Sequence, residues 1–183
     1  MIVEMPDFTL APAHEALLGR LVGMRVQQIV WDVNALYVVL SGLAVKIEVF
    51  GDWPGPSVSS DKYDELVFVR PSQIAPSPIF MSTGEEGLWY KVVAQNANIC
   101  RVEVARTTVV FPGGRIVNPK MDARGVLADV GVILTLESGV VPAVLLENSF
   151  GFATWPEIRC FERSEALSIL GHAYQLRSLT AAA

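Results

Sequence analysis

The chain has 183 residues, of which 51% are apolar and only 18% are charged, and its net charge at pH 7 is −5. Its 14 lysines and arginines are scattered, which argues against nucleic acid and against a basic membrane-binding surface. The length fits one ordinary domain, or two small halves that share a core. Because a typical globular chain is roughly 25% charged, the low charge predicts either a large core or apolar surface that meets a partner, and we expect a homo-oligomer, specifically a dimer.

Membrane and secretion signals are missing from the sequence. The most apolar stretches are interrupted by Lys46, Glu48 or Asp129, so no run of about 18 uncharged apolar residues predicts a transmembrane helix. The first residues, MIVEMPDFTL, carry acids and lack a basic start, which is unlike a secretory signal. Two cysteines, Cys100 and Cys160, do not make a disulfide framework. We therefore predict a cytoplasmic protein with free thiols.

In chain order, the sequence first predicts a short helix over residues 12–20, where Pro12 suits the first helical position. A strand over 24–31 and a hairpin over 33–50 follow, and the hairpin turns at Ser41-Gly42. The second arm of the hairpin alternates, which predicts one buried and one wet face (apolar Val45, Ile47 and Val49; charged Lys46 and Glu48).

The middle of the chain is predicted as two loops, 51–62 and 71–87, and three short strands, 64–70, 88–93 and 99–111. The 71–87 loop is long for a connection inside a compact domain, and loops of that length are usually functional or disordered. In the last of these strands, Cys100 shares an apolar face with Val102 and Val104, opposite Arg101 and Glu103. A cysteine on that face is expected to be inert.

The C-terminal segment, residues 162–179, predicts a longer helix with Ser164 as its N-cap. Its apolar residues recur at helical spacing and should lie on a sheet (Ala166, Leu167, Leu170, Ala173 and Tyr174). Together the elements predict an α+β fold, mainly antiparallel β, with a short N-terminal and a longer C-terminal helix.

Part of the sequence occurs twice. Residues 29–43, IVWDVNALYVVLSGL, align without a gap with residues 126–140, VLADVGVILTLESGV, and both copies continue to Phe-Gly and then Trp-Pro. Each copy reads as Asp-Val, an alternating strand, a Ser-Gly turn and a second strand. We therefore interpret the chain, 1–183, as one compact domain made of two hairpin-containing halves, 1–95 and 96–183, related by internal duplication.

The repeat places Asp32 and Asp129 in matching positions. A pseudo-two-fold axis can bring two such carboxylates together, where they share a proton or hold a metal. The alternative is that each carboxylate bonds the local backbone next to its strand. No histidine is close in sequence to either aspartate, so nothing completes a metal site and we predict no bound metal.

Trp53 and Trp155 are also matched, and each precedes a proline. Such rings can line a shallow apolar or peptide-binding cleft, and the alternative is that each indole plugs the open end of its own hairpin. The FPGGR stretch at 111–115 predicts a turn rather than an anion-binding loop. Phosphate-loop, zinc-site and nucleophile-elbow motifs are absent, so we predict no catalytic residues and no cofactor.

Three functions fit these observations. The first is a non-catalytic cytoplasmic binding or protein-interaction protein that acts through an apolar surface and the 71–87 loop; a toxin-neutralising immunity protein is one example. The second is a small hydrolase or isomerase that uses Asp32 and Asp129. The third is a small-molecule carrier with an apolar pocket between the halves. An enzyme needs polar groups that converge in a cleft, and a carrier needs an enclosed apolar cavity.

Overall fold

The computed structural model describes six stretches of the chain: residues 9–31, 35–51, 67–75, 91–109, 126–146 and 156–181. These stretches contain two helices and nine strands, and every pairing between their strands is antiparallel. The predicted fold class, α+β and mainly antiparallel β, is therefore confirmed.

One described helix precedes all the described strands, and the other lies between the last two strands. In chain order the elements are α1 (Pro12–Gly19), β1 (Arg25–Trp31), β2 (Ala35–Leu40), β3 (Leu43–Gly51), β4 (Val67–Ile74), β5 (Lys91–Val109), β6 (Val126–Leu136), β7 (Val140–Leu146), β8 (Pro156–Glu162), α2 (Arg163–Ala173) and β9 (Gln175–Ser178). Neither described helix has the length and apolar character needed to cross a lipid bilayer.

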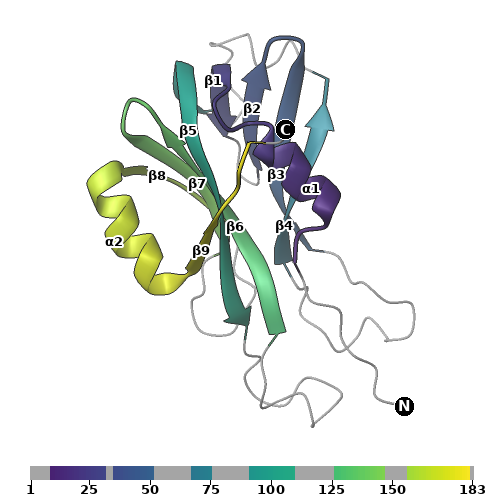
Figure 1. Cartoon of the computed structure of the whole chain (residues 1–183), viewed down its shortest axis with the longest axis vertical. Helices are drawn as coiled ribbons and strands as arrows, with labels where there is room; N and C mark the ends of the chain where they lie inside the picture. Colours follow the sequence, from purple (N-terminus) through teal and green to yellow (C-terminus); the bar gives the residue numbers. More distant parts are fainter. Residues whose placement is uncertain are drawn as a thin grey trace.

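Within β1–β4 and within β5–β8, strands that follow one another in sequence also lie next to one another. The order is β4-β3-β2-β1-β5-β6-β7-β8, and β9 pairs with β5 away from this path. The order is symmetric about the contact between β1 and β5, so β1–β4 and β5–β8 each form a four-stranded meander. Figure 1 shows the first meander on the right and the second on the left and centre.

The long strand β5 joins the two meanders by changing partners along its 19 residues. Its first part, through Asn98, pairs with β1, and from Ile99 onward it pairs with β6 while β9 pairs alongside residues 103–106. Asn96 has a φ of 50°, and the pairing with β6 skips Cys100. Strands commonly turn a corner between two sheets at such bends and bulges.

The continuous strand β5 and its bulge at Cys100 differ from two expectations from the sequence. The segments predicted as separate strands, 88–93 and 99–111, are parts of one continuous strand over the described residues, and the proposed boundary between the halves falls inside it. Cys100 is exposed rather than on the apolar face with Val102 and Val104. The skipped position at Cys100 is the physical reason, because an extra residue in a strand reverses the alternation of faces.

The two meanders form two sheets joined through β5: β1–β4 make the first sheet, and β5–β8 with β9 make the second. The sheets face one another, since β3 contacts β7 and β4 contacts β6 although these strands do not pair. The main core lies between them. It takes side chains from both meanders, including Val26, Ile29, Leu36, Val38 and Ile47 from one and Ile99, Val102, Val104, Val132 and Leu134 from the other. Leu18 of α1 and Leu21 just after it join this core, and α1 packs beside β4 (Figure 1). The short N-terminal helix therefore has a structural role in closing the sandwich.

Both predicted hairpins are present, as β2–β3 and β6–β7. Gly42 and Gly139 stand in their turns with φ of 81° and 88°, a region that side chains other than hydrogen rarely adopt. In β3, Val45 and Ile47 are buried in the core, and Lys46 on the other face pairs with Glu48. The alternation predicted for this arm is confirmed for these residues.

One strand extends further than predicted. The strand expected over 64–70 is described as Val67–Ile74, so the first residues of the predicted 71–87 loop belong to β4. Pro71 pairs opposite Ile47 within it. A proline is tolerated here because β4 is the last strand of the order, and its outer edge pairs with no other described strand. Residues 76–87 of that loop lie outside the described residues.

The C-terminal helix packs as predicted but has different ends. Ala166 and Leu170 of α2 are buried against the outer face of the second sheet, in a cluster with Ile133 and Val141. The N-cap is Glu162 and not Ser164, because β8 runs directly into the helix. After Ala173 the chain turns extended and adds to β5 as β9, where the sequence predicted more helix.

Candidate functional site

The repeat predicted four site residues, and the structure describes one of them. Asp129 lies in β6, whereas Asp32, Trp53 and Trp155 lie outside the described residues. The FPGGR stretch also lies outside them. That Asp32 and Asp129 meet, and that the two tryptophans line a cleft, therefore stay predictions.

Asp129 is 1% exposed, and three donors engage its two oxygens. Arg106 donates from Nε to Oδ1 at 2.7 Å and from Nη2 to Oδ2 at 3.1 Å. The backbone N–H of Leu10 donates to Oδ2 at 2.7 Å. A two-pronged arginine–carboxylate pair is among the stronger and more directional hydrogen-bonded pairs in proteins. Asp129 therefore neutralises Arg106 and attaches the N-terminal segment to the second sheet.

The backbone around Asp129 is shaped for this contact. Arg106 pairs with Asp129 and Ala105 with Gly131, so Val130 is skipped and Asp129 faces the opposite side of the sheet from Gly131. A Cβ on Gly131 would lie 2.6 Å from Leu145 Cδ2 and 2.8 Å from the backbone oxygen of Val144. Glycine at 131 thus allows β6 and β7 to approach closely beside the bulge.

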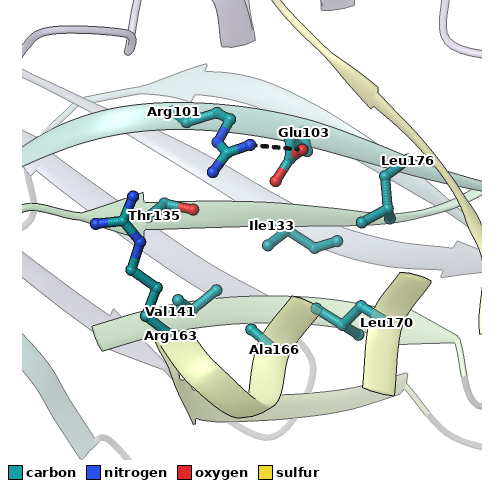
Figure 2. A pocket seen from close by; sticks show the side chains of 9 residues that line it. All are labelled: Arg101, Glu103, Ile133, Thr135, Val141, Arg163, Ala166, Leu170 and Leu176. Carbon is teal, nitrogen blue, oxygen red and sulfur yellow. Dashed lines mark hydrogen bonds and ion pairs between the residues drawn. The ribbon is translucent and has the colours of Figure 1, made fainter. Parts of the chain in front are cut away.

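A different polar site lies on the outer face of the second sheet, beneath α2 (Figure 2). It is a small pocket of about 280 Å³ of empty space, a volume that includes solvent at its mouth. One part of the wall is apolar, formed by Ile133, Val141, Ala166, Leu170 and Leu176. The other part is polar, formed by Arg101, Glu103, Thr135 and Arg163.

Glu103 is the partnered member of the polar group. It is 7% exposed, and it accepts a hydrogen bond from Arg101 Nη1 at 3.5 Å and another from the Ser178 hydroxyl at 3.3 Å. The sequence placed Glu103 on the polar face of its strand. It is nevertheless buried, because α2 packs on this face of the sheet and β9 pairs alongside β5 at Glu103.

Thr135 and Arg163 are the unpartnered members. Thr135 is only 6% exposed. Its hydroxyl opens onto the pocket, and it has no hydrogen-bond partner within the described residues. Arg163, in the first turn of α2, is exposed and has no ion-pair partner in the described part of the chain. Figure 2 shows the Arg163 side chain reaching from the helix toward Thr135. These two groups remain available to a ligand.

The sequence did not single out this pocket, because its residues come from separate elements. Arg101 and Thr135 are cross-strand partners in β5 and β6, and Arg163 is brought in by the helix. The available signal was Thr135 itself, a hydroxyl in the otherwise apolar run 130–136. Only the pairing of β5 with β6 shows that this hydroxyl lies opposite the charged residue Arg101.

Cys160, in β8, shows no sign of activation as a nucleophile. Partial burial of the thiol raises the pKa of Cys160 above its ordinary value, and the positive charge of Lys91 opposes part of that rise. Since the thiolate is the reactive form of cysteine, a raised pKa lowers the nucleophilicity of the thiol at neutral pH. Lys91 itself lies over the Trp31 ring, with Nζ 5.1 Å from the ring centroid.

Within the described residues, no three side chains of His, Cys, Asp or Glu gather in a way that holds a metal ion. Comparisons of the chain with known protein families, with curated proteins and with solved structures find no match. What the chain does is therefore inferred from its own residues.

Proposed function

We propose that this chain is a non-catalytic binding protein of the cytoplasm that holds its ligand in the pocket beneath α2. The observation that carries the proposal is the Thr135 hydroxyl, which is 6% exposed, faces the pocket and has no partner in the described part of the chain. Buried polar groups are normally hydrogen-bonded. Binding pockets typically combine apolar walls with a few such groups that orient the ligand.

The geometry around Asp129 favours binding over the hydrolase or isomerase alternative. A carboxylate that transfers protons needs a free oxygen that substrate or water can reach. Both oxygens of Asp129 already accept hydrogen bonds, from Arg106 and from the Leu10 backbone. The carrier alternative receives less support as well, because the side chains of the main core occupy the space between the sheets over the described residues.

A fragment screen observed by methyl NMR tests this function. We expect some small compounds to shift the methyl signals of Ile133, Val141 and Leu170, which line the pocket. The methyl signals of Leu36 and Val38, which lie in the core between the sheets, serve as the control and stay in place. A screen in which no compound shifts the pocket methyls, or in which every shift comes from another surface, would contradict the proposal.

The homodimer that the composition predicts is a second proposal, and the open edge of β8 supports it. Among the described strands β8 pairs only with β7, and an unpaired strand edge is a ready template for a second chain. Cys160 is exposed on this strand. We expect Cys160→Lys, which puts a charge on the edge, to convert a dimer into a monomer in light scattering after size exclusion. A wild-type protein that is monomeric throughout would overturn the dimer.

The internal duplication is likewise a proposal, and the symmetric strand order supports it. β1–β4 and β5–β8 are successive four-stranded meanders on either side of one contact. Each has its second hairpin turn at a glycine with positive φ, Gly42 or Gly139. We expect an experimental structure to superimpose the two meanders strand for strand with these glycines in register. A best fit with the turns out of register would contradict common descent.

A further inference from the structure

We propose that the ligand of the pocket beneath α2 is a carboxylate on a short branched apolar chain. This inference rests on the proposed function and adds the chemistry of the ligand. The carboxylate would be bound by Arg101, Arg163 and the Thr135 hydroxyl, and the apolar end would contact Ile133 and its neighbours in the wall.

The balance of charge selects an anion. The polar part of the pocket contains two guanidinium groups, Arg101 and Arg163, against one carboxylate, Glu103, which leaves one positive charge in excess. A guanidinium presents a planar fork of donors that matches a carboxylate. A cationic ligand would meet two like charges, so the pocket favours an acid over an amine.

Both arginines are free enough to bind it. Arg101 Nη1 lies 3.5 Å from Glu103 Oε1, which is long for a charge-assisted hydrogen bond, and 38% of the Arg101 side chain is exposed. Arg101 can therefore donate to a ligand without abandoning a strong pair. Arg163 has no partner to leave within the described residues, and it reaches toward Thr135 in Figure 2.

The third donor is the Thr135 hydroxyl, which explains why a polar side chain occupies this position. Its neighbours along the same face of β6 are apolar, and Thr135 pairs across the strands with Arg101. A hydroxyl there can donate to one carboxylate oxygen while the arginines bind from the mouth.

The apolar wall and the small volume limit the rest of the ligand. Ile133, Val141 and Leu170 offer methyl groups to a branched aliphatic end. The pocket opens to solvent, and its enclosed part holds little more than one methyl group or one water. A short branched acid therefore places one methyl group in the pocket and lies with its charged end at the mouth, where Arg163 is exposed.

Two sources supply this chemistry. A free short-chain acid carries it, and so does the C-terminal residue of a peptide that ends in valine. Isovalerate represents the free acid, and N-acetylvaline presents the same acid as the end of a peptide chain. Comparison of the two acids distinguishes the sources. A site for a peptide C-terminus accepts the backbone amide of N-acetylvaline at the mouth of the pocket, whereas a site for a free acid does not.

The experiment is a titration of the methyl-labelled protein with isovalerate, N-acetylvaline, isovaleramide and isoamylamine, followed at the Ile133 methyl. We expect saturable binding of at least one acid with a Kd on the order of 1 mM, at least about tenfold weaker binding of the neutral amide, and no binding of the amine. N-acetylvaline binding as tightly as isovalerate, or more tightly, assigns a peptide C-terminus. Isovalerate binding alone assigns a free acid.

Three variants show whether the named residues bind the acid. Arg163→Gln and Thr135→Val should each weaken binding of the acid about threefold to tenfold or more, since each removes a hydrogen bond to a charged group. Arg163→Lys should have an intermediate effect. Arg25→Gln, an exposed arginine at the start of β1, is the control and should bind as wild type does. Urea unfolding confirms that each variant is folded.

The negative outcomes separate the two proposals. If the amide or the amine binds as well as the acids, or Arg163→Gln binds isovalerate as wild type does, the carboxylate assignment is wrong although the pocket still binds ligands. If none of the four compounds shifts Ile133 but other fragments do, the assignment is also wrong. If no fragment of any kind shifts the pocket methyls, the proposed binding function fails with it.

Discussion

Asp129 and Thr135 lie on the same strand, β6, and are almost equally buried, at 1% and 6% exposed. Their partners differ completely. Asp129 receives three hydrogen bonds from Arg106 and the Leu10 backbone, whereas the Thr135 hydroxyl receives and gives none within the described residues. The bulge at Val130 separates them, because it turns Asp129 to the face opposite that of Gly131, Ile133 and Thr135.

This difference separates a structural polar group from a binding one. A buried charge that is fully paired stabilises the fold only as long as both partners remain. A hydroxyl that opens onto a pocket and has no partner in the described residues contributes little to stability and can bond to a ligand. The exposed fraction of a polar side chain therefore does not distinguish a binding group from a structural one. The number of its hydrogen-bond partners does.

The largest expected effect comes from removing the charge of Asp129, the hydrogen-bonded member of this comparison. Asp129→Asn removes the buried charge that accepts three hydrogen bonds, from Arg106 and the Leu10 backbone, and should lower the free energy of unfolding by about 3 to 5 kcal/mol. Thermal melting measures this loss as a lower Tm. Glu137→Gln is the matched control, because Glu137 is exposed and its carboxylate accepts a hydrogen bond from the Asn98 side chain alone among the described residues, so its effect should stay below about 0.5 kcal/mol. Equal losses in the two variants would mean that Asp129 is not the structural partner described.

A smaller loss is expected when the backbone beside Asp129 is crowded. The Cβ of Gly131→Ala would meet the Val144 backbone oxygen at 2.8 Å, which cannot move aside without shifting β7. We expect a loss of about 1 to 3 kcal/mol. Gly171→Ala is the control, because nothing lies within 4 Å of its Cβ and α2 should gain about 0.5 to 1 kcal/mol from alanine. Urea unfolding distinguishes the opposite signs, and a stable Gly131→Ala would refute the close approach of β6 and β7.

The smallest effects are expected in the pocket, where two hydroxyls can be compared. Ser178→Ala removes a donor to the buried Glu103 and should cost about 1 kcal/mol. Thr135→Val removes a hydroxyl with no partner and should change stability by less than about 0.5 kcal/mol, or increase it. Differential scanning calorimetry of the two variants tests the contrast. A Thr135→Val variant that is less stable than Ser178→Ala would show that the hydroxyl already has a structural partner.

The sequence predicted most of the local structure, because alternation and turn residues act over a few positions. The Ser-Gly turns, the alternating arm from Val45 to Ile47 and the apolar side of the C-terminal helix all follow from such patterns. Cys100 was misplaced because a bulge shifts the alternation by one residue, and nothing in its neighbours announces the bulge. The C-terminal strand β9 was missed because its stability comes from pairing with β5, 69 to 75 positions earlier, where Gln175 lies opposite Arg106 and Ser178 opposite Glu103.

The pocket was outside the reach of sequence analysis for the same reason. Arg101, Thr135 and Arg163 are separated by long stretches of chain and meet only through the β5–β6 pairing and the packing of α2. The repeat, in contrast, directed attention to Asp129, whose role is structural in the described part of the molecule. A pattern that is visible in sequence and a group that is free to bind are different properties.

Urea unfolding of the wild type, Asp129→Asn and Thr135→Val, with and without isovalerate, tests the contrast most directly. At ten times its Kd, a ligand should stabilise the wild type by about 1.4 kcal/mol. We predict that Asp129→Asn is much less stable but keeps this ligand-induced gain, whereas Thr135→Val is as stable as the wild type and, with threefold to tenfold weaker binding, gains only about 0.9 to 0.4 kcal/mol at the same ligand concentration. Loss of the gain in Asp129→Asn, or a full gain in Thr135→Val, would contradict the assignment of one buried group to the fold and the other to the ligand.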